Sequence, residues 1–171
     1  MEIPSLINAK RISIIGPPGS GKSTLAIKLG GALGLPVHHG DCYFLQPNWT
    51  AGDKKKTYEQ LIEIANGDKW IIEGNYVGTL EARCEKGDIV IFLDFDTEFC
   101  RQMVIYRNKS TKRIGVPEFL NNTPDNLDGM MGHIDRWPSR KTEEVLPILE
   151  KYKQKVVTLT NREELETWLT E

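Results

Sequence analysis

Five short apolar runs divide the chain, and helix-like or irregular segments separate them. The runs are Ile12–Ile15, Pro36–His38, Trp70–Ile72, Ile89–Leu93 and Val156–Leu159. Ile89–Leu93 is apolar at every position, which is typical of a strand buried on both faces of a parallel sheet. We therefore expect these runs to form the strands of one buried sheet.

Apolar residues at helical spacing follow several of these runs. Leu25, Leu29 and Leu33 lie four residues apart, and Gly34 followed by Pro36 predicts the end of that helix. The same reasoning predicts helices over 57–66, over 142–152 and after a capping box at 160–163. Strands that alternate with helices predict a doubly wound α/β fold. The segment 115–132 is rich in Gly, Pro, Asn and Asp without a clear period, and we expect a functional loop there.

Composition limits the class of protein. The 171 residues fit a single domain, 1–171. A formal net charge of −2 provides no general attraction for nucleic acid, although 107–113 is a basic cluster. No run matches a signal peptide or a membrane span. Three widely spaced cysteines indicate reduced thiols. We expect a cytoplasmic protein without membrane contact, and the oligomeric state stays open.

A glycine-rich segment reading GPPGSGKST follows the first apolar run. Its residues are Gly16, Pro17, Pro18, Gly19, Ser20, Gly21, Lys22, Ser23 and Thr24. The segment matches G-x-x-x-x-G-K-[ST], the P-loop or Walker A motif, at every fixed position. Glycines let backbone N–H groups converge on one point, and the following helix adds its positive N-terminus. In such a loop Lys22 binds the β- and γ-phosphates and Ser23 binds Mg²⁺, so the motif predicts nucleotide binding.

Asp41 is the first candidate acid outside this loop. It lies just beyond the second apolar run, at the carboxyl edge where α/β sheets bind ligands. A carboxylate there can accept a proton from a hydroxyl group, or hold Mg²⁺ through water. The alternative is an ordinary turn-forming Asp after Gly40.

Four segments together resemble the P-loop small-molecule kinases related to adenylate and shikimate kinase. They are IIGPPGSGKSTLAIKLG, HHGDCYF, WIIEGNY and IVIFLDF. The resemblance covers nearly the whole chain and is strongest to the bacterial adenylate-kinase-related group called DNA topology modulation proteins. It implies five parallel strands in the order 2-3-1-4-5, an acceptor-binding segment at about 41–68 and a lid at about 107–136. It also implies ATP- and Mg²⁺-dependent transfer of the γ-phosphoryl group to a small acceptor, foremost a nucleotide or nucleoside.

In the strand order that the resemblance implies, the third strand neighbours the P-loop strand. Glu73 would then point at the phosphates and help Ser23 to hold Mg²⁺. Asn75 and Tyr76 would contact the acceptor. A strand that simply ends in a Gly-Asn turn is the alternative.

Two further acids, Asp94 and Asp96, follow the fourth apolar run and look like the Walker B acid that orients Mg²⁺. In the implied kinase topology the fourth strand adjoins the Mg²⁺ position less closely than the third. We therefore expect a structural role, with Asp96 capping a helix that begins at Thr97.

Arginines frame the irregular loop. Related kinases carry arginines near Arg107 and Arg113 that close over the γ-phosphate, a role that suits the planar guanidinium. Arg136 and Arg140 would supply the other side of a lid and contact substrate, although each arginine alone could be a solvated surface cation. The resemblance also makes Asn161 a candidate contact for adenine.

The chain departs from adenylate kinases in the acceptor region. It has no arginine between Arg11 and Arg83, where 54–56 supplies only lysines, and Arg83 is the residue that would compensate by binding the acceptor. It lacks the Asp-Gly-aromatic-Pro-Arg signature, and Ser23 stands where adenylate kinases usually have Gly. An uncharged hydroxyl acceptor is therefore about as well supported as AMP. His38, His39 and His133 have no metal-ligand spacing and receive no role.

Two other functions fit the P-loop. One is a nucleotide-dependent regulatory protein that acts on nucleic acid or on a protein partner. The basic cluster at 107–113 supports this function, and the net charge of −2 argues against it. The other is a GTPase switch, but Asn108-Lys109-Ser110-Thr111 lacks the acid of a guanine-reading segment. Phosphotransfer to a small molecule is the function that we expect, with nucleic acid an unlikely partner.

Overall fold

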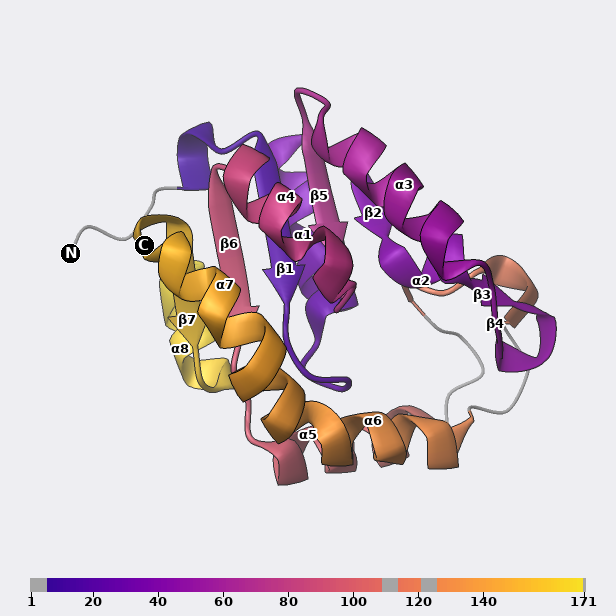
Figure 1. The fold of residues 1–171 in the computed structure, drawn as a ribbon. Helices are drawn as coiled ribbons and strands as arrows, with labels where there is room; N and C mark the ends of the chain where they lie inside the picture. Colours follow the sequence, from indigo (N-terminus) through magenta and orange to yellow (C-terminus); the bar gives the residue numbers. More distant parts are fainter. Residues whose placement is uncertain (1–5, 109–113, 121–125, 171) are drawn as a thin grey trace.

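A five-stranded parallel sheet forms the centre of the protein (Figure 1). The computed structural model describes residues 6–108, 114–120 and 126–170. The strands of this sheet are β1 (Arg11–Ile15), β2 (Val37–His39), β5 (Trp70–Glu73), β6 (Ile89–Leu93) and β7 (Val156–Leu159). They lie in the order β2-β5-β1-β6-β7, and every pair is parallel. Counted along the chain this is 2-3-1-4-5, which confirms the predicted fold.

Helices and short turns connect the strands. The α-helices of the described residues are α1 (Lys22–Leu33), α2 (Gly40–Phe44), α3 (Lys54–Ala65), α4 (Leu80–Lys86), α5 (Thr97–Asn108), α6 (Leu127–Arg140), α7 (Leu146–Lys151) and α8 (Arg162–Trp168). The shorter turns are η1 (Leu6–Asn8), η2 (Pro47–Trp49), η3 (Val77–Thr79), η4 (Glu118–Leu120), the π-helical η5 (Lys141–Val145) and η6 (Lys153–Lys155). An antiparallel hairpin joins β3 (Leu45–Gln46) to β4 (Thr50–Ala51) within the segment predicted to bind the acceptor.

Both faces of the sheet are covered, because side chains alternate along each buried strand. On β1, Ile12 and Ile14 pack in one cluster with Leu29 of α1 and Trp168 of α8. Ile15 belongs to the cluster on the other face, with residues of α4, α6 and α7. β6 is buried at all of its positions, as its uninterrupted apolar run predicts. Among the described residues no helix is long and apolar enough to cross a membrane.

The register of the sheet determines which strand ends meet. Glu73, the last residue of β5, is paired with Ile14 of β1 and with His39 of β2. Ile15 of β1 is paired with Phe92 of β6. The carboxyl ends of these strands therefore form one edge, and the P-loop and α5 begin there (Figure 1).

Three local expectations are corrected. The segment 115–132 is not one loop, because α6 begins at Leu127, where the side chain of Asn126 accepts a hydrogen bond from the N–H of Gly129. Helix α3 begins earlier than the apolar spacing indicates, at Lys54, because Asp53 caps it. The capping box of α8 is one residue later than predicted: Asn161 is the cap, and Glu164 accepts from the N–H of Thr160.

Candidate phosphate-binding and acceptor site

The P-loop connects the end of β1 to the start of α1. Gly19 and Gly21 have φ angles of +85° and +90°, a region that favours glycine. Any Cβ at Gly19 would overlap the backbone carbonyl of Cys100 on α5. Helix α1 has Gly21 at its N-cap, so no capping side chain occupies its first N–H groups. The loop can therefore offer an anion the N-terminus of α1 and the backbone N–H groups of its glycines.

Lys22 and Ser23 occupy the first turn of α1. Lys22 is half-buried, and its Nζ donates a hydrogen bond to the carbonyl of Pro17 at 2.8 Å. Burial lowers the pKa of Lys22, and the carboxylates of Glu73 and Asp41 oppose that effect. Both acids are therefore close enough to act on the ammonium group. Sequence reasoning predicted this grouping of Lys22 with the two acids, and the structure brings the three together.

Glu73 links β5 to the P-loop. Its Oε1 atom accepts a hydrogen bond from the Ser23 hydroxyl at 2.9 Å and lies 2.8 Å from Nδ1 of His39. A carboxylate only accepts, so the Nδ1–H tautomer of His39 fits this contact. Burial acts to raise the pKa of Glu73, but the hydrogen bond from His39 and the charge of Lys22 outweigh it, and the pKa lies below its ordinary value. Glu73 is therefore an ionised oxygen donor beside the P-loop hydroxyl.

His39 is a site residue that sequence reasoning missed. Its side chain is 15% exposed and lies on the neighbouring strand, in register with Glu73. The signal was its place at the end of a strand, two residues before Asp41. Without the register between β2 and β5, that position could not be connected to Glu73.

Asp41 and Tyr76, two residues predicted to bind the acceptor, contact each other. The Tyr76 hydroxyl donates to Oδ1 of Asp41 at 2.7 Å. The ring of Tyr76 lies edge-on to Phe44 and Tyr58 and sits over Gly40, where a side chain would collide with it. Burial and the neighbouring Asp41 raise the pKa of Tyr76, so its hydroxyl stays a donor.

The pKa of Asp41 is raised although its side chain still reaches solvent. Exclusion of water by the surrounding protein is the main cause, and the negative charge of Glu73 is the next. The Tyr76 hydrogen bond and the charges of Lys22 and Arg107 act in the opposite direction. A carboxylate with a raised pKa beside a phosphate site is suited to accept a proton.

Two residues predicted to contact the acceptor have other partners. Arg83 is 0% exposed, and its guanidinium donates to Ser13 Oγ and to backbone carbonyls including that of Gly74. A side chain enclosed in this way does not reach a ligand, so the predicted acceptor contact is wrong and Arg83 supports the sheet. Asn75 directs its amide to the backbone of Gly16 rather than toward Asp41.

The acids after β6 have structural partners. Oδ1 of Asp96 accepts from the N–H groups of Glu98 and Phe99, which confirms its predicted role as the cap of α5. Asp94 forms an ion pair with Lys141 at 2.9 Å. The two acids of the Walker B-like pattern therefore serve as a helix cap and as the partner of a half-buried lysine.

Of the two arginines predicted to close over the γ-phosphate, Arg107 lies near enough for its charge to act on Lys22 and Asp41. It is half-buried near the end of α5, and its positive charge lowers the pKa of both Lys22 and Asp41. Arg113 lies outside the described residues. On α6, Nη2 of Arg136 lies 3.5 Å from Nδ1 of His133, and Nε of Arg140 lies 3.5 Å from Oε2 of Glu144.

The segment predicted to form a lid reaches the P-loop through Gly115. Its φ angle is +79°, and a Cβ there would lie 2.5 Å from Ser23 Oγ and 3.0 Å from His39 Nδ1. The backbone at Gly115 therefore lies against Ser23 and His39, the two residues that contact Glu73. Only glycine fits this approach without displacing the segment.

Asn161 follows β7, where its side chain caps α8 by accepting from the N–H of Glu164 at 2.9 Å. It is exposed and lies at the same sheet edge as the P-loop. The predicted adenine contact is compatible with this location and stays a prediction.

Comparisons with known proteins show the fold. No protein-family model matches the chain, and no curated protein sequence does. Shikimate kinase from Bacteroides thetaiotaomicron superposes with a TM-score of 0.59 at 17% identity, over 93% of this chain and 93% of that chain. Shikimate kinase from Acinetobacter baumannii in complex with shikimate superposes with a TM-score of 0.59 at 14% identity, over 96% of this chain and 92% of that chain. This chain shares the P-loop fold of these kinases.

Proposed function

We propose that the protein is an ATP-dependent phosphotransferase that moves the γ-phosphoryl group to a hydroxyl group of a small acceptor. The observation that carries the proposal is the 2.9 Å hydrogen bond between Glu73 and the P-loop hydroxyl of Ser23, with Asp41 near enough for its charge to act on Lys22. Glu73 accepts a hydrogen bond from the Ser23 hydroxyl, and Asp41 accepts one from the Tyr76 hydroxyl, so the two acids are held in different environments. This arrangement supports a nucleotide-binding site with an acceptor site next to it.

The donor side fits ATP and Mg²⁺. Loop N–H groups and Lys22 would bind the phosphates. Ser20 lies in the same loop, and Thr24 lies in the first turn of α1. Ser23 and Glu73 offer oxygen atoms, and Mg²⁺ in such sites is held by one or two protein oxygens together with substrate phosphates. Among the described residues no group of three or more His, Cys, Asp or Glu side chains is placed to hold a metal ion. When bound, Mg²⁺ neutralises charge on the β- and γ-oxygens.

On the acceptor side, Asp41 would take the proton of the attacking hydroxyl group while Tyr76 holds the carboxylate in place. Arg107, together with Arg113, would stabilise the charge of the transferred phosphoryl group. The segment that contains Gly115 would exclude water when it closes, with Arg136 and Arg140 on its far side. Asn161 would lie near the adenine.

The acceptor we propose is a nucleoside or nucleotide, and the charges of the site favour an uncharged group beside Asp41. No arginine occurs between Arg11 and Arg83, and Arg83 is enclosed in the interior. An acceptor phosphate would also have to approach two carboxylates. The finer resemblance to topology modulation proteins rests on the sequence motifs alone, and a regulatory role on nucleic acid depends on a basic cluster, 107–113, that lies largely outside the described residues. No described feature favours that role.

Nucleotide binding can be tested with a matched pair of lysine variants. Lys22→Ala removes the phosphate contact, whereas Lys28→Ala removes an exposed lysine of the same helix that pairs with Glu166. Calorimetric titration with ATP and Mg²⁺ should show binding for the wild type and for Lys28→Ala and none for Lys22→Ala. Equal binding by both variants would overturn the phosphate assignment.

A further inference from the structure

The side chain of Asn75 binds one residue of the P-loop twice. Its Oδ1 atom accepts a hydrogen bond from the N–H of Gly16 at 3.1 Å, and its Nδ2 atom donates to the carbonyl of the same residue. An amide carries both a donor and an acceptor, so it can match the N–H and the C=O of one backbone residue. These two bonds join the end of β5 to the end of β1. They also occupy the Gly16 N–H, which leaves phosphate binding to the later residues of the loop.

Gly16 is the point at which the loop leaves β1. Its φ angle is +151°, and a Cβ at this position would overlap the carbonyl oxygen of Leu93 on β6. The backbone therefore passes between Leu93 on one side and the Asn75 amide on the other. A change in the path at Gly16 would shift every residue that follows, including Lys22 and Ser23.

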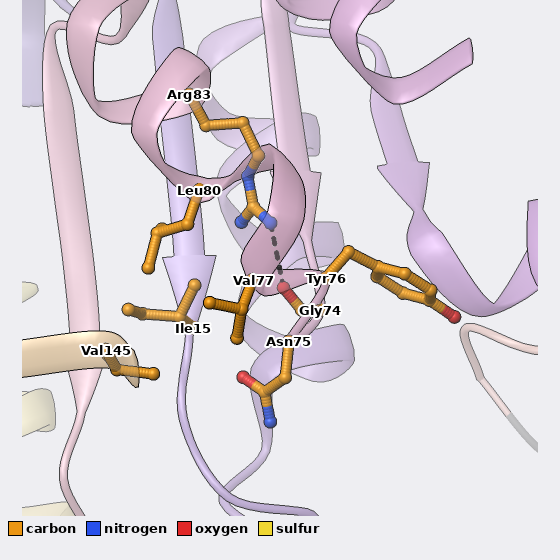
Figure 2. Close-up of a pocket in the computed structure, with 8 residues that line it drawn as sticks. All are labelled: Ile15, Gly74, Asn75, Tyr76, Val77, Leu80, Arg83 and Val145. Carbon is orange, nitrogen blue, oxygen red and sulfur yellow. Dashed lines mark hydrogen bonds between the residues drawn. The ribbon is translucent and has the colours of Figure 1, made fainter. Parts of the chain in front are cut away.

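The backbone that carries Asn75 is itself held firmly. Gly74 has a φ angle of +121°, and its carbonyl accepts a hydrogen bond from Arg83 at 2.9 Å (Figure 2). The same guanidinium bonds to Ser13 Oγ at 2.7 Å and to the Ile72 carbonyl at 3.2 Å. In Figure 2 the Asn75 side chain extends from this turn toward the P-loop, and Tyr76 extends away from it. Two adjacent residues thus serve the two sides of the site.

We propose that Asn75 is a positioning residue that keeps the P-loop in its nucleotide-binding path before the nucleotide arrives. The inference rests on the proposed function, because it assigns Asn75 to nucleotide affinity. Asn75 acts through Gly16 and not through contact with the nucleotide. Holding a binding site in its bound conformation raises affinity, since the free protein no longer divides its population among other conformations.

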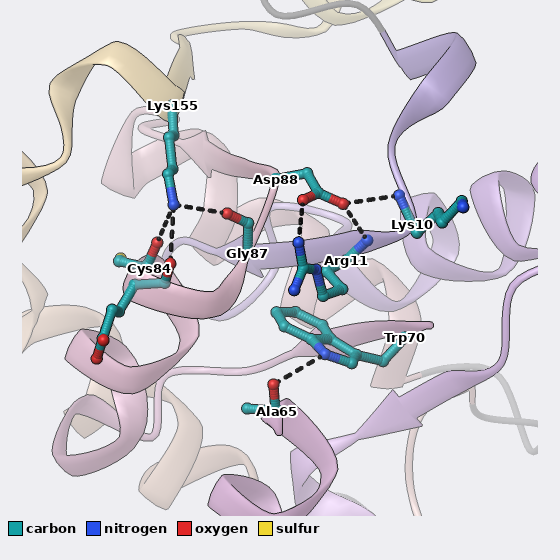
Figure 3. Close-up of polar contacts among 9 residues, drawn as sticks. Lys10, Arg11, Ala65, Trp70, Cys84, Gly87, Asp88 and Lys155 are labelled. Atoms are coloured by element: carbon teal, nitrogen blue, oxygen red, sulfur yellow. Dashed lines mark hydrogen bonds and ion pairs between the residues drawn. The ribbon is translucent and has the colours of Figure 1, made fainter. Parts of the chain in front are cut away.

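A matched control lies at the opposite end of β1. There Asp88 accepts hydrogen bonds from the backbone N–H groups of Lys10 at 2.9 Å and Arg11 at 3.0 Å (Figure 3). Asp88→Ala and Asn75→Ala each remove a side chain that clamps the backbone of the same strand. Only Asn75→Ala does so beside the P-loop.

The experiment is calorimetric titration of wild type and both variants with a non-hydrolysable ATP analogue and Mg²⁺. We expect about tenfold weaker binding for Asn75→Ala, the effect of losing two ordinary hydrogen bonds that preorganise the loop. We expect Asp88→Ala to bind within about twofold of wild type, although both variants unfold at a lower temperature. If Asn75→Ala binds as tightly as wild type, the proposal is wrong. If the wild type binds no analogue, the proposed function itself fails.

Two further readouts cover the case in which Asn75→Ala does not fold. Asn75→Asp keeps the size and the acceptor for the Gly16 N–H but faces the Gly16 carbonyl with a second oxygen. Its deficit in affinity relative to wild type should shrink at acidic pH, where a protonated carboxyl can donate. Hydrogen exchange of the Gly16 amide in the nucleotide-free protein should be faster in the Asn75 variants and unchanged in Asp88→Ala. Unchanged exchange at Gly16 would contradict the clamp directly.

Discussion

Oε1 of Glu73 lies 2.9 Å from Oγ of Ser23, although 50 residues separate the two in sequence. The parallel pairing of β5 with β1 places Glu73 opposite Ile14, just before the P-loop begins. The last residue of one strand and the first turn of the helix after its neighbour are therefore joined at the sheet edge. The acid beside the P-loop hydroxyl belongs to β5 and not to β6.

This relationship predicts which acid supports turnover. Glu73→Gln keeps the shape but removes the negative charge next to Ser23, and we expect it to lower Mg²⁺ affinity or turnover about 10- to 100-fold. Asp96→Asn is the control, because asparagine caps helices about as well as aspartate and turnover should stay unchanged. Steady-state ATP turnover at several Mg²⁺ concentrations measures both variants. A larger loss in Asp96→Asn would show that the Mg²⁺ acid lies after β6.

The rate should depend on pH through Asp41. A proton acceptor works only when ionised, so turnover should fall as the pH drops through the pKa of Asp41. Exclusion of water by the surrounding protein and the charge of Glu73 raise this pKa above its ordinary value of about 3.9. Tyr76→Phe removes a hydrogen bond that lowers this pKa, so the acidic limb of the profile should move to higher pH. Profiles of kcat against pH for both proteins measure the shift. A limb that stays in place would argue against Asp41 as the base.

Gly115 should resist substitution because of both its conformation and its neighbours. Alanine would have to adopt a φ angle of +79° with its Cβ against Ser23, and the conformation alone costs about 1–2 kcal/mol. We expect Gly115→Ala to lower stability and to speed hydrogen exchange in 114–120. Gly31→Ala is the comparison, since a Cβ in that helical position meets nothing within 4 Å. It should stabilise the protein by about 0.5–1 kcal/mol, and equal effects of the two variants would contradict the close approach.

Arg83 should matter for stability. Arg83→Met leaves the Ser13 hydroxyl and the Gly74 carbonyl without their buried donor, which we expect to lower the free energy of unfolding by about 3 kcal/mol. Arg11→Met is the control, because Arg11 is 38% exposed and pairs with Asp88, and such a pair contributes about 0–1 kcal/mol. Urea denaturation of both variants measures the difference. An Arg83→Met protein of wild-type stability would contradict the structural role of Arg83 and would favour its predicted role in acceptor binding.

The sheet and the P-loop could be predicted from sequence because their signals are local. Continuous apolar runs mark strands buried on both faces, and the glycine positions of GPPGSGKST follow from the backbone that the loop needs. The strand order was predicted only from the resemblance to P-loop kinases. The position of Glu73 beside the P-loop depended on that strand order. The contact between His39 and Glu73 depends on the register of two strands, which no local pattern records.

Other misses have equally specific causes. Arg83 looks like any helix-borne arginine in the sequence, and its only sign was Ser13, a polar residue inside an apolar strand that needed a buried partner. Helix α6 escaped prediction because Gly129 and Gly132 interrupt its apolar period, while the buried Ile134 and Trp137 lie in its second half. Tertiary contacts determine both features.

The central claim is phosphoryl transfer, and one assay tests it most directly. ATP labelled in the γ-phosphate is incubated with Mg²⁺ and a panel of nucleosides, nucleoside monophosphates and small polyols, with Lys22→Ala as the control protein. We predict a labelled acceptor that disappears with Lys22→Ala, with nucleosides and other uncharged hydroxyl compounds labelled in preference to monophosphates. Bound ATP with no labelled acceptor in any class would contradict the assignment as a small-molecule kinase.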